Sequence, residues 1–214
     1  MQLNKFIDHT NLKPTATPQD IKNLCAEAVE HQFYAVCVNG CYVHLAHEQL
    51  KTSKIKLAAV IGFPLGAMDT KSKIFEAEQC IAQGADEIDM VINIGQLEAG
   101  NLEVVQNEIA LIKKAIGRKI LKVIIETCYL TKEEIIAACN CALRAKANFV
   151  KTSTGFGTSG ASFEDVKLMK SIVKEELQIK ASGGIKDTET AEKYIKLGAA
   201  RLGTSSGISL IKNI

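Results

Sequence analysis

The sequence predicts an α/β fold, a (β/α)8 TIM barrel in which a single domain spans residues 1–214. Short apolar runs alternate along the chain with segments whose apolar residues recur at helical spacing. Eight such strand–helix units fill the chain, with strand starts roughly 22 to 35 residues apart, and no segment is left over for a second domain. Regular alternation of this kind indicates parallel strands covered by helices, and eight units is the number found in this barrel.

The predicted strands are continuous or nearly continuous apolar runs, as expected for strands that are buried on both faces. Tyr34-Ala35-Val36-Cys37-Val38 and Leu57-Ala58-Ala59-Val60-Ile61-Gly62 are the clearest of them. In chain order, the strands are expected at residues 6–9, 34–38, 57–62, 87–92, 121–125, 149–151, 178–181 and 201–203.

The predicted helices follow from apolar spacing together with signals at their ends. Thr17-Pro18 offers an N-cap and a proline at the first helical position, and Thr131-Lys132-Glu133-Glu134 reads as a capping box. Gly84, Gly117 and Gly198 are expected to stop helices. The helices are expected at 18–29, 42–50, 74–82, 104–115, 132 onward, 163–173 and 187–195, with a last short helix beginning near 205–207.

A doubly wound open sheet is the alternative fold. That fold usually carries a glycine fingerprint after its first strand. Here the first strand continues into Asp8-His9-Thr10-Asn11, which contains no glycine. The barrel therefore remains the preferred interpretation.

Composition excludes several classes of function. The net charge is +2 and no block of like charge occurs, so no nucleic-acid or membrane partner is expected. No apolar run approaches the length of a membrane span, and residues 1–8 contain no signal-peptide apolar region. Seven cysteines, mostly within apolar segments, indicate reduced thiols in a cytoplasmic protein.

The segment Phe149-Val150-Lys151-Thr152-Ser153-Thr154-Gly155 carries the sharpest functional signal. An apolar strand ends in a lysine, and the carboxyl ends of barrel strands are where such enzymes keep their chemistry. A lysine attacks carbonyl groups once its pKa is lowered. Lys151 is, however, one of 23 lysines, most of which must be solvated surface charges.

Two further residues strengthen the hypothesis that Lys151 is a nucleophile. Lys180 lies on the next predicted strand, so both ammonium groups can point into the barrel mouth, where like-charge repulsion lowers a pKa. Asp89 interrupts an apolar strand, and alternation places it on the face opposite Ile88. A carboxylate buried there needs a cation, so the competing interpretation of Asp89 is a purely structural salt bridge with a lysine. The competing interpretation of Lys180 is an ordinary lysine at a strand edge.

The loops after the last two strands predict a phosphate site. Ser182-Gly183-Gly184 and Gly203-Thr204-Ser205-Ser206-Gly207 combine exposed backbone N–H groups with hydroxyl donors. Barrels often bind phosphate at these loops, with a short helix N-terminus behind them. Glycines in turns are common, so each loop alone is weak evidence.

A metal site is not expected. Cys41-x-x-His44-x-x-His47 would fan around a helix instead of converging, and no acidic ligand accompanies it. Cys37 is expected to be a buried thiol that lines the barrel. Asn39 is equally well explained as a turn residue, and Glu126, close to Lys122 by alternation, as a structural partner of that lysine.

Taken together, these segments resemble the deoxyribose-phosphate aldolases, which are class I, Schiff-base aldolases of deoxynucleoside breakdown. The matching segments follow one another over nearly the whole chain and are specific as a set. They are 8–14, 36–39, 60–66, 84–91, 122–127, 149–156, 179–185 and 201–205.

The resemblance implies reversible cleavage of 2-deoxy-D-ribose 5-phosphate to D-glyceraldehyde 3-phosphate and acetaldehyde, with no cofactor and no metal. The Schiff-base lysine of the family falls on Lys151, its second lysine on Lys180 and its proton-relay aspartate on Asp89. The family positions that line the pocket or bind phosphate fall on Asp8, Cys37, Thr154, Gly183, Gly184, Gly203, Ser205 and Ser206.

Other features stay open at this point. Some family members carry a longer tail whose terminal tyrosine reaches the substrate, and the sequence after Ser209 is expected to lack it. Barrels of this kind often dimerise, so a homodimer is one expected assembly. A Schiff-base aldolase or transaldolase with a ketone donor, and a phosphosugar sensor that does not cleave its ligand, are the competing functions.

Overall fold

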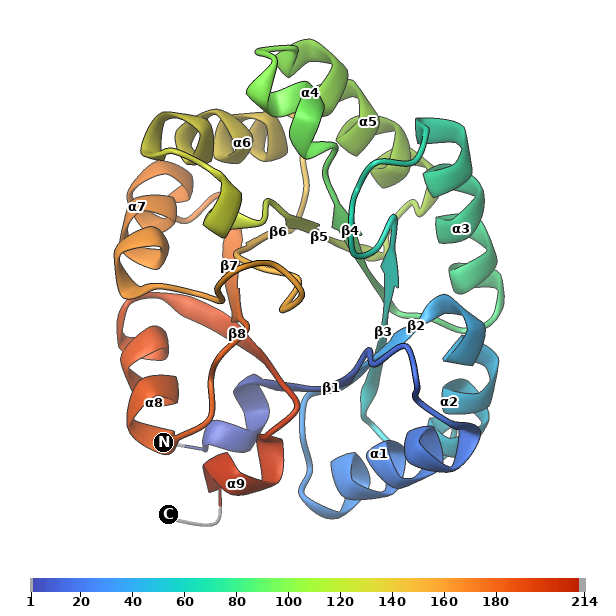
Figure 1. Cartoon of the computed structure of the whole chain (residues 1–214). Helices are drawn as coiled ribbons and strands as arrows, with labels where there is room; N and C mark the ends of the chain where they lie inside the picture. The colour runs from blue at the N-terminus through green and yellow to red at the C-terminus, as the bar shows by residue number, and fades with distance from the viewer. Residues whose placement is uncertain (1, 212–214) are drawn as a thin grey trace.

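Within the described residues, 2–211, a computed structural model of the chain shows eight parallel strands that close into a barrel (Figure 1). Each strand pairs with its neighbours in chain order, and the first pairs with the last. The strands are β1 (Ile7–Asn11), β2 (Ala35–Asn39), β3 (Lys56–Ile61), β4 (Glu87–Val91), β5 (Ile120–Ile124), β6 (Phe149–Lys151), β7 (Gln178–Ser182) and β8 (Ala199–Thr204). The predicted (β/α)8 fold is confirmed.

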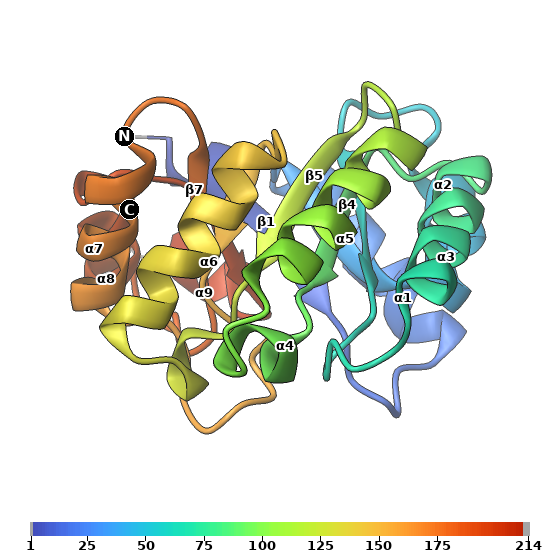
Figure 2. The same cartoon turned by 90° about the horizontal axis from the view of Figure 1, so that it is seen from above.

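Helices surround the strands in a ring, and Figure 2 shows them on both sides of the barrel. They are α1 (Pro18–Glu30), α2 (Val43–Leu50), α3 (Thr70–Ala82), α4 (Ile94–Glu98), α5 (Leu102–Ala115), α6 (Lys132–Arg144), α7 (Phe163–Val173), α8 (Thr188–Lys196) and α9 (Gly207–Ile211). Short 3-10 turns cover Leu3–Phe6, Gly40–Tyr42 and Thr127–Tyr129. The sequence did not predict α4, because five residues are too few to show helical spacing.

Local signals explain where the main helices begin. Thr17 and Asp20 form a reciprocal capping box at α1, and Thr131 and Glu134 form the same arrangement at α6. The side chain of Asp187 accepts a hydrogen bond from the Thr190 backbone N–H at the start of α8. Each cap satisfies donors that the first helical turn leaves unpaired.

Two layers of side chains result from strand alternation. Outward-facing residues such as Ile88, Val123 and Ile179 pack with the helices in one large aliphatic core. Inward-facing positions on one side hold a small apolar cluster of Leu12, Cys37, Ala58 and Val60, against which Phe63 packs. Seven further inward positions of the barrel carry charged side chains, which are described next.

The pairing register brings these charged residues side by side. Lys151 is paired with Lys180 across β6 and β7, and Lys180 with Arg201 across β7 and β8. Asp89 is paired with Lys122 across β4 and β5. In the part of the chain that the structure describes, no helix has both the length and the apolar character needed to cross a membrane.

Candidate active site

A buried ionic network fills the polar side of the barrel interior. Three acidic and four basic side chains from six of the strands take part, and each is at most 4 % exposed. They are Asp8, Glu87, Asp89, Lys122, Lys151, Lys180 and Arg201. Charges so deeply buried are costly unless they are paired, so the network must be nearly balanced.

Asp89 is the centre of the network. Lys151 Nζ and Lys180 Nζ each donate to its Oδ2 at 2.8 Å, and Lys122 Nζ donates to its Oδ1 at 2.7 Å. Burial alone would raise the pKa of Asp89, but Lys122, Lys151 and Lys180 outweigh it and hold that pKa well below its usual range. Asp89 is therefore an ionised carboxylate shared by three lysines.

Lys180 bridges the two inner aspartates. Its Nζ lies 2.5 Å from Asp8 Oδ2 and 2.8 Å from Asp89 Oδ2, while Asp8 Oδ1 accepts from Arg201 Nη1 at 2.9 Å. Burial would lower the pKa of Lys180, but Asp8 and Asp89 raise it above its usual value. Burial would likewise raise the pKa of Asp8, and Lys180, Lys122 and Arg201 reverse that effect. Lys180 is thus held as a cation.

Lys151 differs from the other interior lysines. Its side chain is 3 % exposed, and Asp89 is its ion-pair partner within the described residues. Burial lowers the pKa of Lys151, Asp89 opposes the shift and Lys180 adds to it. Like-charge repulsion from Lys180, which the sequence suggested as the cause, is therefore a contribution smaller than burial.

The charge balance of the network also indicates that Lys151 is the member that is neutral. With every member ionised, four cations face three anions and the interior carries an excess positive charge. Release of one proton from Lys151 balances the network. Lys122 and Arg201 do not release this proton, because nearby carboxylates raise the pKa of each above its usual value.

Sequence reasoning missed the parts played by Lys122, Glu87 and Arg201. Lys122 Nζ lies 2.5 Å from Glu87 Oε2 and 3.6 Å from Asp8 Oδ2, and Arg201 stacks on the Tyr34 ring at 3.4 Å. A signal was present in Leu121-Lys122-Val123, where a charge interrupts an apolar strand as Asp89 does. The partners could not be identified, because barrel closure alone brings β8 next to β1.

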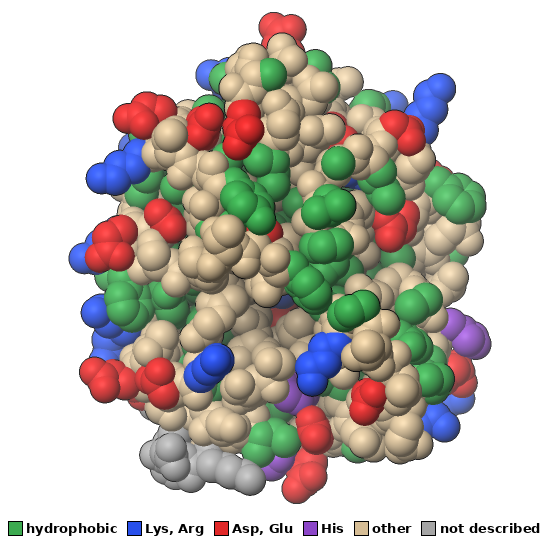
Figure 3. Space-filling model, viewed as in Figure 1, with side chains coloured by type: hydrophobic (Ala, Val, Ile, Leu, Met, Phe, Trp, Pro, Cys, Tyr) green, Lys and Arg blue, Asp and Glu red, His purple; other side chains and the backbone are tan. Residues whose placement is uncertain are grey.

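A pocket of about 470 Å³ opens above the network. Figure 3 shows a hollow near the centre of this face, with hydrophobic side chains gathered beside it. Lys151 lines the pocket, together with six residues that the sequence assigned to substrate binding: Thr154, Gly183, Gly184, Gly203, Ser205 and Ser206. Asp8, Cys37, Asp89 and Lys180 are fully buried and lie outside this lining.

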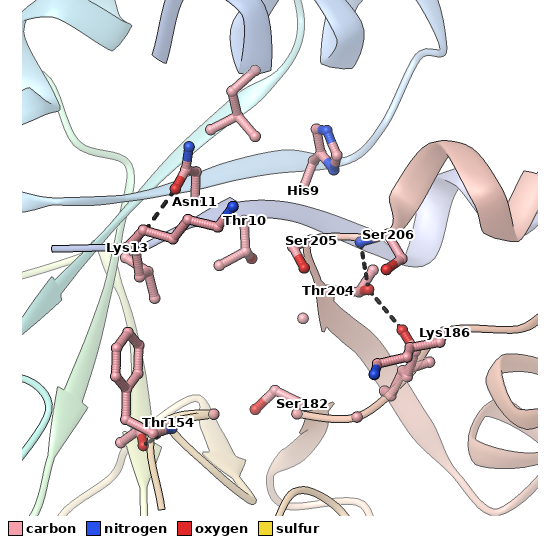
Figure 4. A pocket seen from close by; sticks show the side chains of 18 of the residues that line it. His9, Thr10, Asn11, Lys13, Thr154, Ser182, Lys186, Thr204, Ser205 and Ser206 are labelled. Atoms are coloured by element: carbon pink, nitrogen blue, oxygen red, sulfur yellow. Dashed lines mark hydrogen bonds between the residues drawn. The ribbon is translucent and has the colours of Figure 1, made fainter. Parts of the chain in front are cut away.

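The two predicted phosphate loops meet on one side of the pocket (Figure 4). A side chain at Gly183 would meet Gly160 Cα at 2.8 Å, and the φ of Gly183 is +85°. A side chain at Gly203 would meet Ser182 Cβ at 2.9 Å. Thr204 Oγ1 accepts from Ser206 N at 2.9 Å and donates to Ile185 O at 2.8 Å, which fixes the second loop.

Two lysines that the sequence did not single out also line this pocket. Lys13 follows β1, and Lys186 follows the Gly183–Gly184 turn. Figure 4 shows Lys13 near Thr10 and Asn11, and Lys186 near Thr204 and Ser206. The pocket therefore offers cationic side chains and hydroxyl groups at its mouth and Lys151 at its base.

The remaining predictions concern residues that do not line this pocket. Burial raises the pKa of the Cys37 thiol, and Cys37 packs in the apolar cluster, as expected of a core cysteine. Cys41, His44 and His47 form no metal-binding group among residues 2–211. Glu126 bonds to Thr154, so the expectation that it partners Lys122 is wrong. Predictions about the chain ends fall partly on residue 1 and residues 212–214, which lie outside the described residues.

Comparisons with known proteins agree with this geometry. A sequence model described as "DeoC/LacD family aldolase" matches residues 3–214. A deoxyribose-phosphate aldolase of Thermotoga petrophila is 56% identical over 206 residues, which is 96% of this chain and 83% of that protein.

Solved structures give the same result. One named "QR15, an Aldolase" has a TM-score of 0.95 at 41% identity and covers 99% of this chain and 95% of its own. A deoxyribose phosphate aldolase from Aeropyrum pernix, described as having a unique tetrameric structure, has a TM-score of 0.90 at 31% identity and covers 99% and 90%. The homodimer expected for this chain stays a prediction.

Proposed function

The chain belongs to the DeoC/LacD family of aldolases, and from this premise we propose that it cleaves 2-deoxy-D-ribose 5-phosphate reversibly to D-glyceraldehyde 3-phosphate and acetaldehyde through a Schiff base on Lys151. The observation that carries the proposal is a lysine with a lowered pKa at the base of a pocket whose upper wall is built from glycine and serine loops. A neutral amine and an anion site are the two features this substrate requires.

The first step uses the free amine of Lys151. The amine adds to the C1 carbonyl of the open-chain sugar, and loss of water gives an iminium. The C3 hydroxyl then gives its proton to a water molecule, the C2–C3 bond breaks and its electron pair moves into the iminium, which becomes an enamine. D-glyceraldehyde 3-phosphate leaves at this point. The iminium is the electron sink, so the step needs no metal.

The second half returns the enzyme to its starting state. The enamine takes a proton at C2, water adds to the resulting iminium, and acetaldehyde leaves while Lys151 is restored. Asp89 lies within 2.8 Å of Lys151 Nζ, which supports a role in moving protons to and from this nitrogen. Lys180, kept cationic by Asp8 and Asp89, supplies the charge that disfavours protonation of Lys151.

The phosphate group is assigned to the loops at the pocket wall. Gly183, Gly184, Gly203, Ser205 and Ser206 line it with backbone and hydroxyl groups, and Lys186 adds a positive charge. Binding energy at this end of the substrate would hold C1 against Lys151. The proposed role is in the breakdown of deoxyribonucleosides in the cytoplasm.

Turnover of 2-deoxy-D-ribose 5-phosphate tests the proposal. With a chelator present, the purified protein should release D-glyceraldehyde 3-phosphate and acetaldehyde in equal amounts, and Lys151→Ala should abolish release. Binding of the sugar phosphate without cleavage would instead indicate a sensor. A preference for dihydroxyacetone-type ketone donors over acetaldehyde in the reverse direction would indicate a different Schiff-base aldolase.

A further inference from the structure

Glu126 is a buried acid that the steps above do not use. It is 2 % exposed and follows β5 with a φ of 54°, a left-handed conformation that is uncommon outside glycine. The flanking backbone bonds run to the segment that contains Lys151: Ile125 N donates to Lys151 O at 3.0 Å, and Thr127 N donates to Thr152 O at 2.9 Å. The carboxylate is thus aimed at the start of the loop after β6.

Among the described residues, hydrogen-bond donors contact that carboxylate and no cation does. Thr154 N lies 3.1 Å from Oε1 and 3.2 Å from Oε2, and the Thr154 hydroxyl donates to Oε2. The Cys128 thiol lies 3.9 Å from Oε1. Within the described chain these contacts include no ion pair. A buried carboxylate is costly without a cation, so its retention here needs another explanation.

The bonding of Thr154 supplies that explanation. A hydroxyl has one donor and two acceptor positions. The donor of Thr154 is used by Glu126, and one acceptor position is used by Phe156 N at 3.0 Å. What remains is one acceptor position on a residue that lines the pocket (Figure 4).

We propose that Glu126 is a positioning residue that fixes the hydrogen-bond polarity of Thr154, so that Thr154 presents only an acceptor to the pocket and binds a hydroxyl group of the substrate. A carbonyl oxygen and a phosphate dianion are acceptors and cannot use this position. The inference rests on the proposed function, since the substrate must carry a hydroxyl group between its reacting carbon and its phosphate.

The surrounding loop is built to keep this arrangement. A side chain at Gly157 would meet Cys128 Sγ at 2.5 Å and Glu126 Cδ at 3.3 Å. At its other end, the loop is held by Ala161 N, which donates to Ser182 O at 3.0 Å and to Gly183 O at 3.3 Å. Glu126 therefore anchors one end of a loop whose other end contacts the phosphate loop.

The isosteric variant Glu126→Gln reverses the polarity. Its amide oxygen can still accept from Thr154 N, but its NH2 group must donate to the Thr154 hydroxyl. Both acceptor positions of Thr154 are then filled, and its O–H turns toward the pocket as a donor. A substrate hydroxyl can then only accept from Thr154, and its own O–H loses the acceptor that Thr154 offers in the wild-type protein. Glu133→Gln on the exposed face of α6 is the matched control.

The test compares two acceptors in condensation with acetaldehyde. D-glyceraldehyde 3-phosphate carries the hydroxyl, and 3-oxopropyl phosphate lacks it. The ratio of their kcat/KM values does not depend on the fraction of folded enzyme. We expect Glu126→Gln to lower this ratio roughly tenfold, with the loss mainly in KM for the hydroxylated acceptor. Thr154→Val should lower it similarly, Thr154→Ser should keep it, and the Glu126→Gln/Thr154→Val double variant should lose no more than either single one.

Several results would overturn the inference. One is an unchanged ratio of kcat/KM values in Glu126→Gln. Another is an equal loss of kcat/KM with both acceptors in that variant, which is the result expected of a merely structural residue. An unchanged ratio in Thr154→Val would do so even if Glu126→Gln did not fold. A wild-type enzyme that uses both acceptors equally well would contradict the inference while upholding the aldolase. No turnover with either acceptor would instead refute the proposed function, and the inference with it.

Discussion

Lys151 and Lys180 donate to the same oxygen atom, Oδ2 of Asp89, each at 2.8 Å. The two lysines are nevertheless opposite in acid–base character. Lys180 has a second carboxylate, Asp8, and its pKa is raised. Lys151 has only Asp89 among the described residues, and burial lowers its pKa. Asp89 is thus shared by Lys180, which is held as a cation, and by Lys151, whose amine can be neutral.

Lys180→Met should shift the pH dependence of cleavage to higher pH. The substitution removes a positive charge that lowers the pKa of Lys151 and frees Asp89 to stabilise protonated Lys151. Each unit by which the pKa of Lys151 rises leaves roughly tenfold less neutral amine at pH 7. The pH profile of kcat/KM would measure the shift, with the exposed Lys167→Met as control. If kcat/KM of the variant changes at the same pH as that of the wild type, the two lysines are not electrostatically coupled.

Asp8→Asn should make the protein less stable at neutral pH and less sensitive to acid. The folded-state pKa of Asp8 lies below its unfolded value, so its stabilisation is present above about pH 4 and is lost as pH falls further. Breaking this buried pairing with Lys180 and Arg201 should cost about 3–5 kcal/mol at pH 7. Denaturant unfolding between pH 7 and pH 3 measures both effects. The exposed Glu175→Gln should change the unfolding free energy by less than about 1 kcal/mol; a similar loss in both variants would contradict the prediction.

Gly203→Ala should impair substrate binding and stability together. The added methyl group would lie 2.9 Å from Ser182 Cβ and 3.0 Å from Lys180 Cε, so the phosphate loop or Lys180 must move. We expect a loss of about 1–3 kcal/mol in unfolding free energy and a higher KM for the sugar phosphate. Gly95→Ala in α4 meets only Asn93 Oδ1, at 3.7 Å, and should leave KM unchanged. A Gly203→Ala enzyme with wild-type KM would contradict the assigned role of this loop.

The sequence predicted the fold because each strand is an apolar run of the right length. It also placed Asp89 on the face opposite Ile88, because side chains alternate along a strand. Lys151 and Lys180 were singled out as candidates by their places at the ends of predicted strands. These conclusions need only the local periodicity of the sequence and the number of strand–helix units.

The remaining features depend on contacts between distant strands. The three-lysine environment of Asp89 requires the register of β4, β5, β6 and β7, and the bridge from Asp8 to Arg201 requires closure of β8 onto β1. The sequence therefore could not rank burial above charge repulsion as the cause of the lowered pKa of Lys151. It also paired Glu126 with Lys122, because alternation gives no information about which loop folds over a strand end.

Borohydride reduction in the presence of acetaldehyde, followed by peptide mass spectrometry, tests the central claim most directly. The account predicts one ethyl group on Lys151 in the wild-type protein and none at this rate on any other lysine. Lys151→Ala should not be trapped, whereas the control Lys167→Met should be trapped like the wild type. Modification of a different lysine, or full trapping in Lys151→Ala, would contradict the assignment of Lys151 as the nucleophile.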